Sequence, residues 1–186
     1  SPKHHSPAWG LAEIIRSLSD ILEAAPSDTV KLALENTAGQ GNTVGRRFEE
    51  LADIMEGCTC PERLRVCLDT AHAFAGGYTL HTKDAVSCLA QDIQHSVGLE
   101  RLMLLHLNDS RSECGSRVDR HEHIGKGNIG KEGFRHLLGH PAFHGLPGII
   151  ETPKTDAPVT ADRHNLQLLR SLESEATTDS GTLPNT

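Results

Sequence analysis

The stretch that decides the fold is residues 65–107, RVCLDTAHAFAGGYTLHTKDAVSCLAQDIQHSVGLERLMLLHL. It opens with RVCLD at 65–69 and closes with LMLLHL at 102–107, two short apolar runs of the kind that form buried strands. Between them, apolar residues recur at helical spacing over 85–93, and Thr82 is in position to cap that helix. Strands that are apolar throughout and joined by a helix predict a parallel sheet covered by helices.

The same alternation continues on both sides of this stretch. We expect further strands at 30–35 and 148–151, and further helices at 11–24, 46–55, 131–138 and 160–172, the last capped by Thr160. Four β/α units are half of an eight-stranded barrel, which typically needs about 250 residues. The fold class predicted is therefore α/β, a TIM (β/α)8 barrel of which this chain carries roughly the carboxyl-terminal half to two-thirds. Its domain is predicted at 11–172, between a disordered start at 1–10 and a disordered tail at 173–186.

Length and composition favour a soluble, intracellular protein of one domain. The chain has 186 residues and no run of about 18 consecutive apolar residues, so no membrane segment is predicted. Its five cysteines include no CxxC pair, which favours a reducing compartment: the nucleus or mitochondrion in a eukaryote, the cytoplasm in a bacterium. A net charge of −7 argues against a generic basic coat for nucleic acid, although bound divalent cations would change that balance.

Every predicted strand ends in a side chain that can bind a metal or move a proton. These side chains are Glu35, Asp69, His106 and Glu151. In parallel α/β folds the active site lies at the carboxyl ends of the strands, so the four are expected to converge on one face. A capping carboxylate or a core histidine is the plainer interpretation of each one singly, but it fits poorly for all four together.

Two further clusters add potential ligands. DTAH places Asp69 and His72 three residues apart, and DRHEH contains Asp119 and His121, with His123 nearby. Mixed histidine and carboxylate ligands without thiolates suit Zn²⁺, Mn²⁺ or Fe²⁺ in a catalytic site. Six or seven such groups exceed the needs of one tetrahedral ion and imply two or three, the arrangement that supports in-line phosphoryl displacement.

Two kinds of loop feature are candidates for phosphate contacts. Glycine-rich segments at 36–45, 74–80 and 125–130 could bring backbone amides close to phosphates, although such loops are more often plain turns. The basic residues Arg117, Arg120 and Lys126 lie beside the second histidine cluster. They are candidate nucleic-acid contacts, and a solvated charged loop is the alternative.

Four segments in order resemble the endonuclease IV family, also described as apurinic/apyrimidinic endonuclease family 2. They are LENTAGQGNTVG (34–45), VCLDTAHAFAGGYTL (66–80), LHLNDSRSECGSRVDRHEHIGKGNIG (105–130) and IIETP (149–153). The resemblance spans about residues 11–170. It departs from the family pattern at Ala71 and Arg111, neither of which is a ligand position.

The resemblance implies a TIM barrel whose three zinc ions cleave DNA in base-excision repair. The reaction implied is hydrolysis of the phosphodiester on the 5′ side of an abasic site, leaving a 3′-hydroxyl. The implied partner is double-stranded DNA containing abasic sites, and the full-length protein is expected to be a monomer without membrane association.

The family's motif positions imply a role for each candidate ligand. Glu35 would bridge the first two zinc ions; Asp69, His106 and Glu151 would complete the second; His72, Asp119 and His121 would hold the third. Glu35 and Glu151 are the residues expected to be catalytic. The resemblance also implies that the family's amino-terminal segment is missing here, with two more histidine ligands of the first zinc. Two complete zinc sites are therefore expected, with Mn²⁺ as an alternative metal.

Two other functions remain open from the sequence. One is a metal-dependent sugar isomerase or epimerase, since related barrels also place Glu, Asp and His at strand ends. A third His/Asp site argues against it, because a one- or two-metal isomerase does not need one. The other is a truncated, inactive remnant that binds metal or DNA.

Overall fold

The sheet is parallel, as the sequence predicts. The computed structural model describes residues 2–154 and 158–180. Four strands are hydrogen-bonded in the order β1-β2-β3-β6, all parallel. They are β1 (Leu32–Glu35), β2 (Leu64–Asp69), β3 (Leu102–His106) and β6 (Gly148–Ile149).

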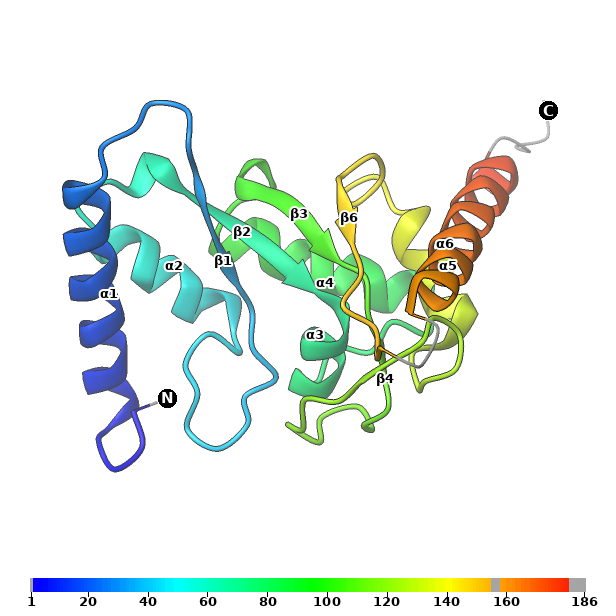
Figure 1. Ribbon diagram of the computed structural model, residues 1–186, viewed down its shortest axis with the longest axis horizontal. Helices are drawn as coiled ribbons and strands as arrows, with labels where there is room; N and C mark the ends of the chain where they lie inside the picture. The colour runs from blue at the N-terminus through cyan, green and yellow to red at the C-terminus, as the bar shows by residue number, and fades with distance from the viewer. Residues whose placement is uncertain (1, 155–157, 181–186) are drawn as a thin grey trace.

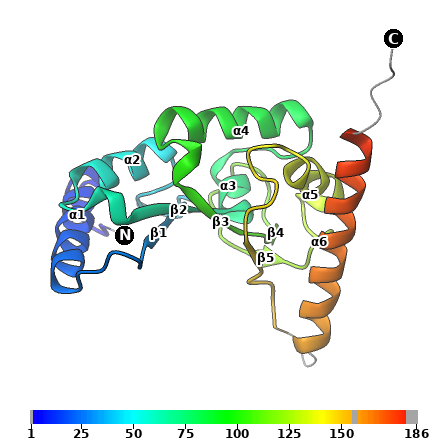
Figure 2. The ribbon, with the colours of Figure 1, turned by 90° about the horizontal axis from the view of Figure 1, so that it is seen from above.

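Helices α2, α4 and α5 lie along one face of this sheet, with α1 and α6 at its two ends (Figures 1 and 2). The helices are α1 (Pro7–Ala24), α2 (Phe48–Gly57), α3 (Thr70–Gly76), α4 (Lys83–Ser96), α5 (Gly130–Leu138) and α6 (Pro158–Ser180). Two single-turn 3₁₀ helices, Pro61–Arg63 and Leu99–Arg101, precede β2 and β3. A short antiparallel pair, β4 (Asp109–Ser110) and β5 (His121–Glu122), follows β3.

The core fills the space between the sheet and the helices. Leu64, Val66 and Leu68 of β2 are fully buried in one hydrophobic cluster, which also holds Phe48 of α2 and Leu89 of α4. Because successive side chains of a strand point to opposite faces, this alternation directs the remaining side chains of β2 away from the helices. Helix α4 begins where the sequence predicts, since the Thr82 side chain accepts a hydrogen bond from the backbone N–H of Ala85.

The amino-terminal region differs from the predicted disordered start. Helix α1 begins at Pro7, four residues before the predicted helix, and residues 7–10 form its first turn. Ser6 accepts a hydrogen bond from the backbone N–H of Trp9, and proline is well suited to the first helical position. A serine–proline pair therefore defines a helix start here, although its composition resembles that of a flexible segment.

The carboxyl-terminal helix also differs from the prediction. Helix α6 begins at Pro158, so Thr160 lies within it instead of capping it, and residues 173–180 are helical instead of disordered. Ala176 in this part is only 7% exposed and packs against Gly139. Tertiary packing thus stabilises a polar sequence as a helix; residues 181–186 of the predicted tail lie outside the described residues.

Several element boundaries shift, and three elements besides the two 3₁₀ helices were not predicted. Strand β1 begins at 32 instead of 30, and β6 covers only 148–149, so Glu151 lies two residues beyond it. Helix α2 spans 48–57 instead of 46–55, and α5 begins at Gly130. The unpredicted elements are α3, β4 and β5, each too short to show a clear periodicity.

A buried carboxylate organises the glycine-rich loop at 125–130. Asp109 is 0% exposed, and its oxygens accept hydrogen bonds from the backbone N–H groups of Gly125 (2.8 Å), Gly127 (3.0 Å) and Ile129 (3.0 Å). Its own neighbour Ser110 donates a further backbone hydrogen bond at 2.8 Å. The sequence predicted that backbone N–H groups of this loop could contact a phosphate. In the structure, those of Gly125, Gly127 and Ile129 donate hydrogen bonds to Asp109 instead. Asp109 also lies opposite Glu122 in the antiparallel ladder of β4 and β5, so this one residue connects the loop to the β4–β5 hairpin.

Replacing Asp109 should destabilise the fold strongly. We expect Asp109→Ala to lower the free energy of unfolding by about 3–5 kcal/mol, because several buried N–H groups lose their acceptor at once. Urea unfolding followed by circular dichroism measures this loss. Asp53→Ala, which removes an exposed carboxylate from α2, is the control and should change stability by less than about 0.5 kcal/mol. An Asp109→Ala variant as stable as this control would contradict the assigned role.

Candidate metal centre

The strand ends bring four of the predicted ligands together. Glu35 ends β1, Asp69 ends β2, His106 ends β3, and Glu151 follows β6. One potential ligand atom from each of these side chains lies within 4.8 Å of the others. Nδ1 of His106 is 3.2 Å from an oxygen of Glu35 and 3.1 Å from an oxygen of Glu151. The parallel register therefore produces the convergence that the sequence predicts.

A second group lies beside the first and shares Asp69 with it. Ligand atoms of Asp69, His72 and His121 also lie within 4.8 Å of one another. Asp119 joins them, since its two oxygens are 3.1 Å from Nε2 of His72 and 3.3 Å from Nε2 of His121. We call the whole set the metal centre: Glu35, Asp69, His72, His106, Asp119, His121 and Glu151. All seven candidates from the sequence meet in this one region.

The unpredicted helix α3 explains how the two groups connect. Asp69 is the N-cap of α3, and its Oδ1 accepts a hydrogen bond of 2.7 Å from the backbone N–H of His72. This cap fixes the turn that carries His72 from the end of β2 toward Asp119. The antiparallel pairing of β4 and β5 fixes the backbone at His121, because this residue begins β5 and lies opposite Ser110 of β4. Both elements that the sequence failed to reveal thus position ligands.

The concentration of carboxylates changes the acidity of the site. Burial raises the pKa of Asp69 above its ordinary value. Burial also acts to raise the pKa of Glu35, but the hydrogen bond from His72 and the charge of His106 outweigh it, and the pKa is lowered. For His72, burial alone would lower the pKa; the hydrogen bond to Glu35 and the charges of Asp69 and Asp119 raise it to about 9. The site therefore favours bound positive charge.

Two unpaired nitrogen atoms indicate that a metal ion fits this site. Nδ1 of His106 and Nε2 of His121 are buried and make no hydrogen bond to any described residue, although each faces carboxylate oxygens. Nδ1 of His121 is 3.2 Å from the carbonyl oxygen of Glu151, and Nδ1 of His72 is 2.9 Å from that of Asn36. Contacts of this kind fix the imidazole tautomer and leave Nε2 free for a metal. The donor set suits a divalent ion such as Zn²⁺.

Sequence reasoning missed the polar residues that hold these ligands. The side chain of Asn36 both accepts from the backbone N–H of Asp69 (2.7 Å) and donates to its carbonyl oxygen (3.2 Å). Thr70 and Asn108 link the ends of β2 and β3. Each of the three lies one or two residues after a ligand position, and that adjacency is the only signal the sequence carried.

The three candidate DNA-binding residues are exposed, and they lie within a few residues of Asp119 and His121 along the chain. Arg117 and Arg120 flank Asp119, and Lys126 lies in the loop held by Asp109. Arg117 has a positive φ of 55°, stabilised by a hydrogen bond from its backbone N–H to the carbonyl oxygen of Ala75. Arg120 contacts the carbonyl oxygen of Asp119 at 2.6 Å. These positions leave the three cations facing solvent, and their contacts with DNA remain a prediction.

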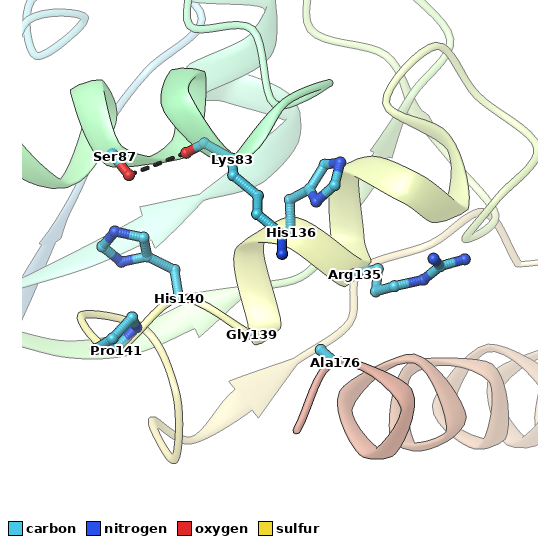
Figure 3. Close-up of a pocket in the computed structure, with 8 residues that line it drawn as sticks. All are labelled: Lys83, Ser87, Arg135, His136, Gly139, His140, Pro141 and Ala176. Atoms are coloured by element: carbon cyan, nitrogen blue, oxygen red, sulfur yellow. Dashed lines mark hydrogen bonds between the residues drawn. The ribbon is translucent and has the colours of Figure 1, made fainter. Parts of the chain in front are cut away.

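A separate cavity lies between α4, α5 and α6 (Figure 3). Its volume is about 350 Å³, and its wall includes Lys83, Ser87, His136 and His140. Figure 3 shows that the hydroxyl of Ser87 donates to the carbonyl oxygen of Lys83 within its own helix. No member of the metal centre is among the residues that line this cavity, so the cavity is distinct from the metal centre.

Comparisons with known proteins agree with this geometry. A family model described as a xylose isomerase-like TIM barrel matches residues 1–172, which defines the class to which the fold and site belong. Proteins named "Probable endonuclease 4" are 45% identical over 167 residues in Trichlorobacter lovleyi and 47% identical over 163 residues in Chloroflexus aggregans. The chain belongs, within that class, to the endonuclease IV family.

Solved structures give the same result. Endonuclease IV from Thermus thermophilus aligns over 89% of this chain with a TM-score of 0.76 and 37% identity. A D-tagatose 3-epimerase-like protein shares the fold alone, at 21% identity and a TM-score of 0.62. The chain spans 59% of the length of the Trichlorobacter relative, 57% of the Chloroflexus relative and 58% of the Thermus structure. Of the described helices, none is both long and apolar enough to cross a membrane.

The electrostatics of the metal centre predict an unusual titration in metal-free protein. In excess chelator we expect His72 to titrate near pH 9 instead of 6.5. Because its folded-state pKa is raised, its contribution to stability is fully present below about pH 6.5 and is lost as the pH rises through about 9. NMR of the imidazole nitrogens measures this pKa, and Glu35→Gln should lower it. A wild-type His72 that titrates near 6.5 would contradict the effect assigned to Glu35, Asp69 and Asp119 on its pKa.

Proposed function

We propose that this chain carries the metal centre of a zinc-dependent DNA-repair endonuclease. The reaction proposed is hydrolysis of the phosphodiester on the 5′ side of an apurinic/apyrimidinic site, with a 3′-hydroxyl as product. The observation that carries this proposal is the pair of ligand groups joined at Asp69, because adjacent divalent ions are suited to in-line displacement at phosphorus. The names of the endonuclease relatives support the choice of DNA as substrate.

The seven side chains fit the division of roles implied by the family. Glu35, Asp69, His106 and Glu151 would hold one zinc ion, and His72, Asp119 and His121 a second; Glu35 would also contribute to a third. When bound, zinc supplies Lewis-acid activation of water and of the phosphate. Mn²⁺ is the alternative metal, since the same oxygen and nitrogen donors accept it.

Among the chain's own groups, Glu35 and Glu151 are the proposed catalytic residues. Their side chains are 34% and 47% exposed, whereas the carboxylate of Asp69 is fully buried. The two glutamates can therefore contact substrate and water, while Asp69 serves to hold the site. Both lie against Nδ1 of His106, which keeps their carboxylates on the same side of the strand ends.

The proposed partner is double-stranded DNA that contains an abasic site. Arg117, Arg120 and Lys126 would contact its phosphate backbone beside the metal centre, and such contacts position DNA without reading its sequence. Bound divalent ions would offset part of the net charge of −7, so metal-free protein should bind DNA poorly. By analogy with bacterial relatives we place the protein inside the cell, as a monomer at full length.

The activity is tested on a duplex that contains a tetrahydrofuran abasic analogue. We expect strand incision that requires metal and is abolished by chelator, with a 3′ end that a polymerase extends. Glu151→Gln should lower the incision rate at least about 100-fold, because it removes an anionic ligand of the proposed metal site and so weakens the ion that would activate water and phosphate. Glu56→Gln, an exposed substitution on α2, is the matched control and should incise like the wild type.

The outcomes separate the three functions. Metal-dependent incision supports the endonuclease. Bound metal without incision supports an inactive remnant, and metal-dependent conversion of a ketose without incision supports the sugar isomerase or epimerase. An incision rate that Glu151→Gln leaves unchanged would contradict the catalytic role of this glutamate.

The DNA contacts have their own test. Lys126→Ala should reduce by about one the slope of log affinity against log salt, because each phosphate contact releases about one counterion. Fluorescence anisotropy with the abasic duplex, in Ca²⁺ to prevent cleavage, measures this slope. Arg170→Ala, which removes an exposed cation from α6, is the control. Equal slopes for Lys126→Ala and the wild type would remove Lys126 from the interface.

A further inference from the structure

The side chain of Asn108 connects two members of the metal centre. Asn108 is 0% exposed and lies two residues after His106 at the end of β3. Its Oδ1 accepts a hydrogen bond of 2.7 Å from the backbone N–H of Glu151. Its Nδ2 donates to Oδ2 of Asp69 at 2.6 Å and approaches Oε2 of Glu151 at 3.4 Å. A single amide therefore contacts two carboxylates, one at the end of β2 and one just beyond β6, the two strands that flank β3.

The surroundings leave this amide one orientation. Oδ1 must accept, because its partner is an N–H group, and Nδ2 must donate, because its partners are carboxylate oxygens. The backbone is fixed as well: Thr70 donates to the carbonyl oxygen of Asn108 at 2.7 Å and accepts from its N–H at 2.9 Å. Fully satisfied buried networks of this kind are rigid and specify one geometry.

We propose that Asn108 is a positioning residue of the metal centre, which holds the carboxylates of Asp69 and Glu151 in the orientation that binds metal. This inference rests on the metal centre of the proposed function. The oxygens that Nδ2 contacts also lie near the histidines: Oε2 of Glu151 is 3.1 Å from Nδ1 of His106, and Oδ2 of Asp69 is 3.8 Å from Nε2 of His121. Partners of this type, outside the ligands themselves, typically change metal affinity by about 10- to 100-fold.

The chemistry of the site requires a neutral group that both donates and accepts. An aspartate at this position would place a third carboxylate against Asp69 and would lack the donor. An alanine would leave the N–H of Glu151 and the buried oxygen of Asp69 without partners. Asn36 makes the corresponding link between β1 and β2 but touches only the backbone of Asp69, so the carboxylate contact is particular to Asn108.

The test is Co²⁺ binding to the whole chain, because Co²⁺ reports ligand geometry through its visible spectrum. We expect Asn108→Ala to weaken Co²⁺ binding by about 10- to 100-fold and to alter the spectrum of the bound ion. Val66→Ala, which removes buried volume from β2 without touching a carboxylate, is the control for stability. It should lower the unfolding temperature and leave affinity and spectrum unchanged. An Asn108→Ala variant with wild-type affinity and spectrum overturns the proposal.

A second measurement uses the wild type alone and does not depend on how the variant folds. The side-chain amide signals of Asn108 should shift in ¹⁵N NMR spectra as Zn²⁺ is added, because their carboxylate partners become ligands. Those of Asn42, whose side chain is exposed, should not shift. If the side-chain amide signals of Asn108 do not shift when Zn²⁺ is added, the proposal is overturned. Wild type that binds no Co²⁺ overturns the metal centre and this inference together, whereas bound Co²⁺ without DNA incision overturns only the proposed function.

Discussion

The fully buried carboxylate of Asp69 is the constraint on which the rest of the site depends. Burying a carboxylate is costly unless it is paired and hydrogen-bonded. Here the backbone N–H of His72 in the first turn of α3 and the side-chain amide of Asn108 donate hydrogen bonds to this carboxylate, and Nε2 of His121 lies 3.8 Å from it. The same groups place Asp69 between both sets of ligands, so the interactions that stabilise the end of β2 also form the metal centre.

The strands and the convergence of the candidate ligands could be predicted from the sequence because both follow from local pattern. Apolar runs such as 102–107 mark buried strands, and a parallel sheet places the residues that follow them on one side. The misses arise where tertiary contacts decide. The polar segment around Ala176 is helical because it packs against the rest of the protein. Asp109 accepts hydrogen bonds from backbone N–H groups of the 125–130 loop, although nothing in the local sequence distinguishes it from other loop aspartates.

The described residues form two ligand groups without help from any other segment. The sheet has four strands, and the chain spans 57–59% of the length of the two endonuclease relatives compared with it. Met103 of β3 and Ile149 of β6 are exposed, as expected where half of a barrel leaves strands uncovered. Asp69 and His72 are held by hydrogen bonds to described residues, among them Asn36 and Asn108, so metal binding can be tested on this chain directly.

The most direct test of the account is to locate the metal. Crystals of the chain grown with Zn²⁺ and measured at the zinc absorption edge reveal bound zinc by anomalous scattering. The account predicts one peak among Glu35, Asp69, His106 and Glu151 and another among His72, Asp119 and His121. Zinc at other positions, with neither site occupied, would contradict it.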